Sequence, residues 1–262
     1  MRVSCGMRIP RALFRMFAFF AICMATSAWV LAGVVILSIL RRSRTQKRQW
    51  VQGVLTRFFS RLHRVMGMRI RWDGDLPEEP CVLMGNHRSY VDAILFPVEF
   101  PVVYVARVET KSWPIIGWGA TLIGTIWVDR NNKSSRKQTR ETVRQRLADG
   151  MGLVIFPEGT THKGPELLDY RPGMFYTCAE EGFAITPVAI EYANPNIAWV
   201  GNDLFIPHAF EHFGAKHIDI AVRFGPRMVS REAESLRKQV RDWTEANCLE
   251  LRAQFDNEGR QF

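Results

Sequence analysis

Hydrophobic residues follow three different patterns along this 262-residue chain. From Met16 to Leu40, 25 residues carry no charge. From Trp50 to Met66, apolar residues recur at helical spacing with arginines between them. From residue 81 onward, short apolar runs alternate with polar stretches of helix length. The three patterns predict an apolar helix, a basic amphipathic helix and an α/β domain, in that order.

The charge-free run from Met16 to Leu40 predicts a membrane anchor. As a helix it would be about 37 Å long, enough to cross a hydrocarbon layer of about 30 Å with some tilt. A cleaved signal peptide is the main alternative, but the run is long for one and no small-residue cleavage pattern follows it. A re-entrant or interfacial helical pair is the other alternative. We expect residues 1–48 to form a basic N-terminus and an uncleaved anchoring helix.

The amphipathic pattern that follows carries Arg57, Arg61 and Arg64 among its apolar residues. A helix of this kind suits the headgroup region of a bilayer, so we assign residues 49–72 to a basic amphipathic interfacial segment. An ordinary helix that packs on the domain is an equally good interpretation.

The remaining residues, 73–262, alternate between strand-like and helix-like stretches. Runs rich in β-branched and apolar residues predict strands, at 81–84, 101–106, 123–128, 152–156, 183–190 and 217–224. Capping residues and helical spacing predict helices, at 91–96, from 110 to 117–119, from Ser134 or Ser135 to Asp149, and at 230–253. Alternation of this kind predicts an α/β sheet with crossover helices, where ligand sites gather beyond the carboxyl ends of the strands.

The positive charge of the chain is concentrated at its N-terminal end. Of 35 Lys and Arg residues, 14 precede the first acidic residue, Asp73, and the rest of the chain carries 21 basic against 26 acidic residues. A nucleic-acid-binding protein would usually carry its basic patch on the folded domain, so this distribution favours a membrane surface and no nucleic acid. Five basic residues in 41–48 against four in 2–15 place the following domain in the cytoplasm.

Neither the cysteines nor the histidines form a metal-binding pattern. The cysteines are odd in number and lack CxxC spacing, which predicts free thiols rather than a disulfide framework or a zinc site. The five are Cys5, Cys23, Cys81, Cys178 and Cys248. His208, His212 and His217 are loosely spaced and lack an HExxH arrangement, so we expect no metal.

The stretch from Asn86 to Asp92 carries the main candidate chemistry. His87 follows a predicted strand end, and Asp92 lies five residues later in the first turn of a predicted helix. That fold-back can bring the carboxylate to one imidazole nitrogen and leave the other free to take a proton from a substrate hydroxyl. Because such a pair also arises by chance, its assignment depends on the rest of the chain.

Three further stretches belong to strands of the same predicted sheet. Phe156–Thr161 places the Glu158 carboxylate and backbone amides at a strand end, and 124–130 delivers the Arg130 guanidinium to another. The third stretch, 185–190, is a strand with a proline followed by a valine. Taken singly, the first also fits a turn made of good turn formers and the second a surface arginine.

Together and in this order, the four stretches resemble those of the glycerolipid acyltransferase superfamily, and most closely the bacterial 1-acyl-sn-glycerol-3-phosphate acyltransferases. The resemblance covers roughly Val82 to Phe224. It implies an α/β fold with a mixed central sheet and flanking helices, preceded by an N-terminal membrane helix. Residues 73–262 would form the acyltransferase domain.

The resemblance also implies a role for each matched residue. His87 would remove the proton from the acceptor hydroxyl as it attacks an acyl thioester, and Asp92 would orient the imidazole, as the aspartate of a serine-protease triad does. Arg130 would bind the acceptor's phosphate. The other implied acceptor-binding residues are Glu158, Gly159, Thr160 and Arg171. No metal or other cofactor takes part, and acyl-CoA or acyl carrier protein supplies the acyl group as a substrate.

Two positions depart from the family's pattern. Where the family commonly has an arginine and then a serine, this chain has Thr161 and His162. Lys163 or Arg171 could supply the missing charge. Alternatively, the acceptor lacks a simple phosphate, as a lyso-aminolipid would.

These expectations combine into an acyltransferase of the inner (cytoplasmic) membrane, with its catalytic domain facing the cytoplasm. Its partners would be an acyl donor and a lipid acceptor held in the phospholipid bilayer. The expected reaction converts 1-acyl-sn-glycerol-3-phosphate (lysophosphatidic acid) to phosphatidic acid for phospholipid synthesis. A lyso-ornithine lipid or a lysophospholipid is the alternative acceptor, and a non-catalytic lipid-binding protein is the alternative class.

Overall fold

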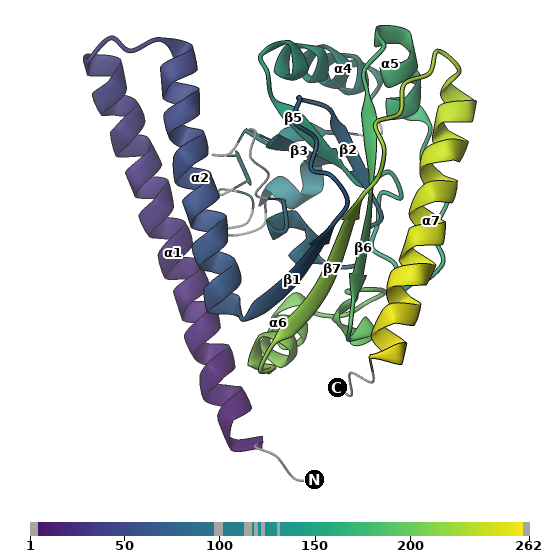
Figure 1. Ribbon diagram of the computed structural model, residues 1–262. Coiled ribbons are helices and arrows are strands. Elements are labelled where there is room, and N and C mark those ends of the chain that lie inside the picture. The colour runs from purple at the N-terminus through teal and green to yellow at the C-terminus, as the bar shows by residue number, and fades with distance from the viewer. Residues whose placement is uncertain are drawn as a thin grey trace.

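A seven-stranded mixed sheet organises the protein (Figure 1). The computed structural model describes residues 5–96, 102–112, 117, 120–121, 124–129 and 132–258. The strand order is β1-β7-β6-β2-β5-β3-β4, and every neighbouring pair is parallel except β6 with β7. The strands are β1 (Met68–Asp73), β2 (Val82–Gly85), β3 (Val102–Arg107), β4 (Ile126–Val128), β5 (Gly152–Ile155), β6 (Ile185–Tyr192) and β7 (Ile218–Phe224).

The predicted fold class is confirmed, and six of the strands lie where the apolar runs predicted them. The strand β1 was not predicted, because its sequence alternates with arginines and looked like the end of a basic segment. It pairs along its whole length with β7. The range 49–72 assigned to an interfacial segment is therefore wrong at its end, since the sheet already begins at Met68.

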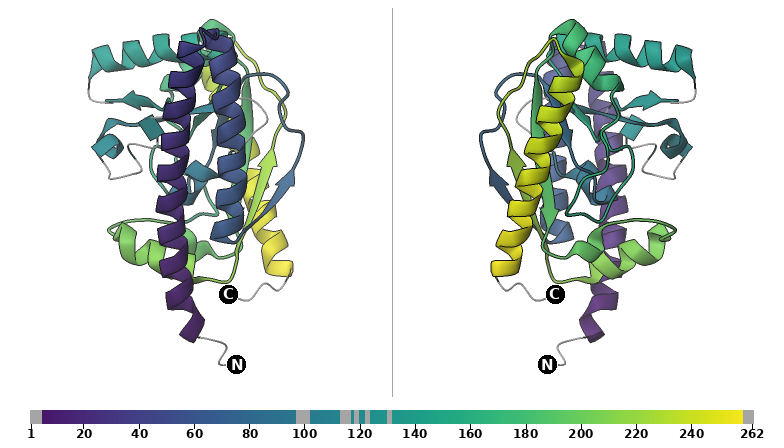
Figure 2. Two further views of the ribbon diagram at one scale, coloured as in Figure 1. Left: turned by 90° about the vertical axis from the view of Figure 1, so that its left-hand side faces the viewer. Right: turned by 90° about the vertical axis from the view of Figure 1, so that its right-hand side faces the viewer.

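Helices cover both faces of the sheet, as Figures 1 and 2 show. The α-helices are α1 (Cys5–Ile39), α2 (Arg44–Met66), α4 (Lys133–Ala148), α5 (Gly173–Glu181), α6 (Phe205–Gly214) and α7 (Ala233–Asn257). Short 3-10 helices occur at Tyr90–Ile94, Val108–Ser112 and Pro195–Ile197. Helices α5 and α6 were not predicted. The cap of α4 is also corrected, because the Asn132 side chain accepts from the amides of Ser134 and Ser135.

Two hydrophobic clusters lie on opposite faces of the sheet. On one face, Leu62 and Met66 of α2 pack with residues of β6 and β7. On the other face, Leu236 and Val240 of α7 pack with the residues of β6 and β7 whose side chains point to that face. Strand β6 is buried along all of its length, as expected for a strand covered on both faces.

The helix α2 packs on the domain with its apolar side, which is the second of the two interpretations of its sequence. Val54, Phe59, Leu62 and Met66 are buried in the protein interior. The side that remains exposed carries the arginines 57, 61 and 64. These buried residues of α2 thus belong to the core of the domain.

The helix α1 has the opposite surface. Its segment Met7–Ile39 is long and apolar enough to cross a membrane, and only 6% of its most apolar window is buried. The large apolar side chains exposed along it are Met7, Ile9, Leu13, Phe14, Phe17, Met24, Trp29, Leu31, Val35, Ile36 and Ile39. The helix begins well before the predicted Met16, and it runs beside α2 in Figures 1 and 2.

One buried side chain of α1 fixes this helix to the domain. The Arg15 guanidinium donates to the carbonyl oxygens of Val65 at the end of α2 and of Phe213 at the end of α6, at 3.1 and 2.9 Å. It also donates to the carbonyl oxygen of Lys216 at 3.0 Å. A cation at two helix C-termini satisfies carbonyl groups that have no partner within the helix.

Candidate active site

The predicted site lies at the carboxyl end of β2, the central strand of the sheet. Asn86 follows this strand directly, and its side chain pairs with both backbone groups of Ile190 in β6, each at 2.8 Å. This pairing extends the contact between β2 and β6 by one side chain. This pairing fixes the position of the next residue, His87, at the carboxyl end of β2.

The predicted fold-back from His87 to Asp92 is present. The 3-10 helix Tyr90–Ile94 turns the chain back, so that Nδ1 of His87 lies 2.7 Å from Oδ2 of Asp92. The His87 ring stacks on Phe156, with 4.2 Å between ring centroids. Its side chain is 22% exposed, and Nε2 has no hydrogen-bond partner among the described residues. The arrangement presents one nitrogen of an oriented imidazole for proton transfer.

The Asp92 carboxylate is fully buried, and its position is set by four donors. Besides His87, the amides of Arg88 and Ser89 donate to Oδ2 at 2.7 and 2.9 Å. The Tyr192 hydroxyl donates to Oδ1. Sequence reasoning missed Tyr192, because it ends a strand 100 residues away and its only signal was its place at the carboxyl end of β6.

The Glu158 carboxylate is buried and is bonded to the backbone amide of His87. It is 3% exposed and accepts from the amides of His87 at 2.7 Å and Leu168 at 3.0 Å. Burial raises the pKa of Glu158, and these backbone donors oppose that shift. Gly159 has a φ of +74°, the left-handed conformation that a turn requires of glycine here.

The other predicted acceptor-binding residues lie around this edge with less contact. Thr160 and the Arg171 side chain are exposed. The backbone amide of Arg171 donates to Pro157 O at 2.9 Å, which places this residue beside the Glu158 turn. Arg130 follows β4 but lies outside the described residues.

The two departures from the family pattern, Thr161 and His162, lie in the segment that is hydrogen-bonded to the main chain of His87. The Thr161 hydroxyl donates to the carbonyl oxygen of Trp199, so it is used within the protein. The His162 amide donates to the carbonyl oxygen of His87 at 2.8 Å. The segment after Glu158 is therefore hydrogen-bonded to the main chain of His87.

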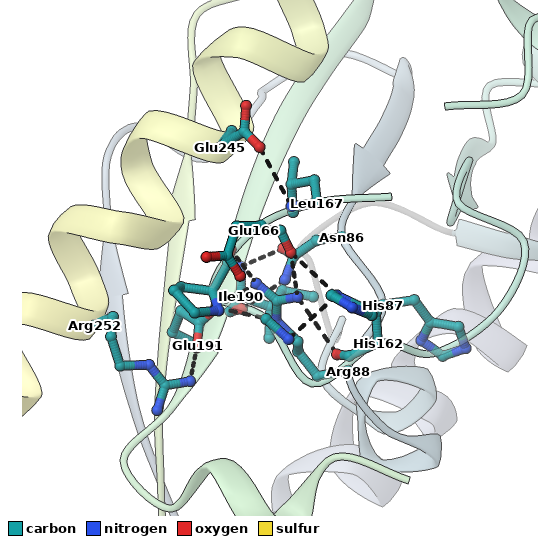
Figure 3. A network of polar contacts seen from close by, with 12 residues as sticks. Asn86, His87, Arg88, His162, Glu166, Leu167, Ile190, Glu191, Glu245 and Arg252 are labelled. Atoms are coloured by element: carbon teal, nitrogen blue, oxygen red, sulfur yellow. Dashed lines mark hydrogen bonds and ion pairs between the residues drawn. The ribbon is translucent and has the colours of Figure 1, made fainter. Parts of the chain in front are cut away.

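A second feature that the sequence did not predict is a buried ion network behind this edge, drawn in Figure 3. Arg88 is 1% exposed and pairs with Glu191 of β6 at 2.6 Å. Arg252 of α7 pairs with the other oxygen of the same carboxylate. An arginine in a polar stretch is usually at the surface, so only the three-dimensional contacts reveal it.

The described cysteines offer neither a nucleophile nor a metal site. Cys81, Cys178 and Cys248 are buried and unpaired, and Cys23 is also a free thiol. Burial raises the pKa of the Cys178 thiol to about 12. Among the described residues, no group of three or more His, Cys, Asp or Glu side chains could hold a metal ion.

Comparisons with known proteins identify relatives that are named as acyltransferases. A family model described as Acyltransferase matches residues 68–191. The lyso-ornithine lipid O-acyltransferase of Rhizobium meliloti is 32% identical over 201 residues, which cover 68% of this chain and 68% of that protein. The protein of that name from Pseudomonas aeruginosa is 32% identical over 164 residues, covering 59% of this chain and 62% of that protein.

Two further comparisons concern proteins named for a different acceptor. A 1-acyl-sn-glycerol-3-phosphate acyltransferase of Neisseria gonorrhoeae is 29% identical over 135 residues, or 48% of this chain and 53% of that protein. The crystal structure of PlsC from Thermotoga maritima shares the fold, with a TM-score of 0.69 over 94% of this chain and 98% of that one at 19% identity. The chain belongs to the acyltransferase family, which confirms the resemblance inferred from its motifs.

Proposed function

We propose that this protein transfers a fatty acyl group from an acyl thioester to the free hydroxyl of a membrane lysolipid, with His87 as the general base. The observation that carries the proposal is the Nδ1–Oδ2 contact of 2.7 Å, which orients a partly exposed imidazole. Nε2 takes the proton of the hydroxyl while its oxygen bonds to the thioester carbonyl carbon. When the carbon–sulfur bond breaks, the leaving thiolate accepts this proton from the imidazolium.

The acceptor itself supplies the nucleophile in this mechanism. Ser89 is buried and its amide, like that of Arg88, is bound to Asp92. The thiols of Cys81, Cys178 and Cys248 are buried, and burial raises the pKa of each. A thiol kept protonated in this way is a poor nucleophile.

For the acceptor, we favour a lyso-ornithine lipid over the lysophosphatidic acid expected from the sequence motifs. Two observations support this choice. Three relatives at 31–32% identity carry that name, including the protein of Brucella abortus over 201 residues. Thr161 and His162, beside His87, bring no permanent cation to the place where the family commonly has an arginine for phosphate.

Lysophosphatidic acid is the second candidate. The Neisseria relative named for it and the predicted phosphate-binding role of Arg130 both support it. The acyl donor, acyl-CoA or acyl carrier protein, and a cytoplasmic orientation of the domain remain parts of the proposal. The exposed apolar surface of α1 supports a location at the membrane.

The general-base role is tested by His87→Ala in vesicles, with free thiol and esterified lipid both measured. We expect acyl transfer to fall by about 1,000-fold, as loss of a general base does. The variant should still fold and bind vesicles, at some cost in stability because the buried Asp92 loses one of its four donors. Full activity of a folded His87→Ala protein would contradict the mechanism.

The acceptor is tested by competition between purified lyso-ornithine lipid and lysophosphatidic acid in the same vesicles. We expect a kcat/KM at least about tenfold higher for lyso-ornithine lipid, or about 1.4 kcal/mol of discrimination. The reverse ratio would overturn this acceptor and support the phosphate-bearing one.

A further inference from the structure

The buried guanidinium of Arg88 connects the catalytic stretch to the loop of residues 162–166. Its Nη2 donates to the carbonyl oxygen of Pro165 at 2.8 Å. Its Nη1 donates to the carbonyl oxygens of Glu166 and His162 at 3.3 and 3.4 Å. Figure 3 shows these contacts converging on one side chain. The path of the loop is therefore organised around Arg88.

The charge of Arg88 is held in place from the opposite side. Glu191 accepts from Nη2 at 2.6 Å and from Nε at 3.0 Å through one carboxylate oxygen. Arg252 of α7 binds the other oxygen. A buried guanidinium is stable only with such a partner, and two bonds from its fork fix its orientation.

Gly164 shows how closely the loop fits around the guanidinium. A Cβ atom at this position would lie 2.3 Å from Cζ and 2.4 Å from Nη2 of Arg88. The residue also has a φ of +73°, which favours glycine. The loop can follow this path only because residue 164 has no side chain.

The same loop is hydrogen-bonded to the main chain of His87. The His162 amide donates to the carbonyl oxygen of His87 at 2.8 Å, and the Trp199 amide donates to the carbonyl oxygen of Arg88 at 3.0 Å. The acceptor hydroxyl must reach His87, so the head group attached to it has to lie near these segments. A displaced loop would misplace the head group.

We infer that Arg88 is a positioning residue that sets the path of the 162–166 loop and through it the binding of the lysolipid head group. The inference rests on the proposed acyl transfer. It gives Arg88 a specific kinetic signature. Loss of Arg88 raises the KM of the acceptor, while the KM of the acyl donor stays unchanged.

The experiment compares Arg88→Met with Arg252→Met in vesicles, because each removes one arginine from Glu191 and only the first removes the loop contacts. We expect Arg88→Met to lower kcat/KM for the acceptor by about 100-fold, the cost of a misplacement of about 1 Å. Arg252→Met should lower the unfolding temperature but leave the acceptor KM within about twofold of the wild-type value. Equal acceptor KM values in the two variants overturn the inference.

A pair of glycine variants decides the question if Arg88→Met does not fold. Gly164→Ala pushes against Arg88, whereas Gly150→Ala meets no atom within 4 Å, although the φ of Gly150 is +77°. Both variants place an alanine at a similar positive φ. We expect only Gly164→Ala to raise the acceptor KM, and equal kinetics of the two alanine variants overturn the inference.

The wild-type protein separates this inference from the proposed function. A wild type that acylates no lysolipid overturns the proposed function and this inference with it. A wild type that acylates lysolipid, together with variants of unchanged acceptor KM, overturns only the role of Arg88.

Discussion

The stretch from Asn86 to Asp92 and the helix α1 reverse the usual rule of burial in opposite ways. In the first, the polar side chains of Asn86, Arg88 and Asp92 are buried. In the second, large apolar side chains such as Phe17 and Trp29 are 73% and 64% exposed. Buried polar groups require partners, and large exposed apolar surfaces usually mark a contact with something else. Each reversal thus indicates a separate part of the function, one for chemistry and one for location.

The two regions also differ in how their side chains are constrained. Both carboxylate oxygens of Asp92 accept hydrogen bonds from within the protein. Because the carboxylate is fixed in this way, it also fixes the imidazole of His87. The helix α1 is held to the domain through its other side, where Arg15 binds the ends of α2 and α6. The stretch from Asn86 to Asp92 is specified by contacts within the chain, whereas the outer face of α1 depends on its surroundings.

Asp92→Asn should have the largest effect, because it changes the partner of Nδ1 without changing the size of the side chain. We expect kcat to fall by about 1,000-fold, since the amide no longer holds the required tautomer of His87. Steady-state kinetics with saturating acceptor and donor measure this effect. Asp75→Asn, at an exposed position, is the matched control and should retain full activity. An Asp92→Asn protein with wild-type kcat would separate the buried carboxylate from the chemistry.

Phe17→Asp combined with Trp29→Asp should have the next largest effect, on location rather than on chemistry. Two apolar side chains contribute about 3 kcal/mol when buried in a bilayer, so partition into vesicles should fall by about 100-fold. Flotation of vesicles measures the bound fraction. Leu249→Asp makes the same kind of change at an exposed position of α7 and should leave binding unchanged. If both proteins bind equally, α1 is not the membrane contact.

His212 belongs to α6, which packs against α1, and it predicts a dependence of stability on pH. Burial, with His208 nearby, lowers the pKa of His212 from 6.5 to about 4. Between pH 6.5 and 4 the unfolded chain binds a proton that the folded protein does not, so stability falls as the pH is lowered through this window. We expect a loss of about 2–3 kcal/mol from this residue.

Chemical denaturation at pH 7 and pH 4.5 measures this loss, and His212→Gln should reduce it. Burial also lowers the pKa of His63, so part of the pH dependence should remain. His162→Gln, at a more exposed position, serves as the control. A His212→Gln protein with an unreduced pH dependence would contradict the assignment of the effect to His212.

Tyr192→Phe should have the smallest effect, because it removes one of four donors to Asp92. A hydrogen bond to a charged group contributes about 1.5–3 kcal/mol, and only part of it acts on the reaction, so we expect kcat to fall by about tenfold. The acceptor KM should not change. Tyr170→Phe is the control, since Tyr170 is equally buried but packs in the cluster on the other face of the sheet. Equal kcat values in the two variants would show that Tyr192 does not act on Asp92.

The sequence predicted the parts of this structure that depend on neighbouring residues. Apolar runs identified the strands β2 to β7, and the predicted helix start after His87 indicated that the chain folds back to bring Asp92 to the imidazole. The inner side of α2 could not be assigned, since its spacing suits a membrane surface and a protein core equally. Only the packing of Leu62 and Met66 decided between them.

The parts that could not be predicted depend on residues far apart in the chain. Tyr192 and Glu191 contact Asp92 and Arg88 across about 100 residues, a distance over which periodicity and motif spacing carry no information. The strand β1 exists because β7 offers it a partner 150 residues later. The functions predicted for Glu158, Gly159, Thr160 and Arg171 stay predictions, as does that of Arg130.

The most direct test of the central claim is a rapid-mixing measurement of thiol release from acyl-CoA, with and without lysolipid in the vesicles. If His87 activates the acceptor's own hydroxyl, release begins only when lysolipid is present and matches the ester formed mole for mole. A rapid burst of thiol in the absence of lysolipid, equal to the amount of enzyme, would reveal an acyl-enzyme and contradict direct attack.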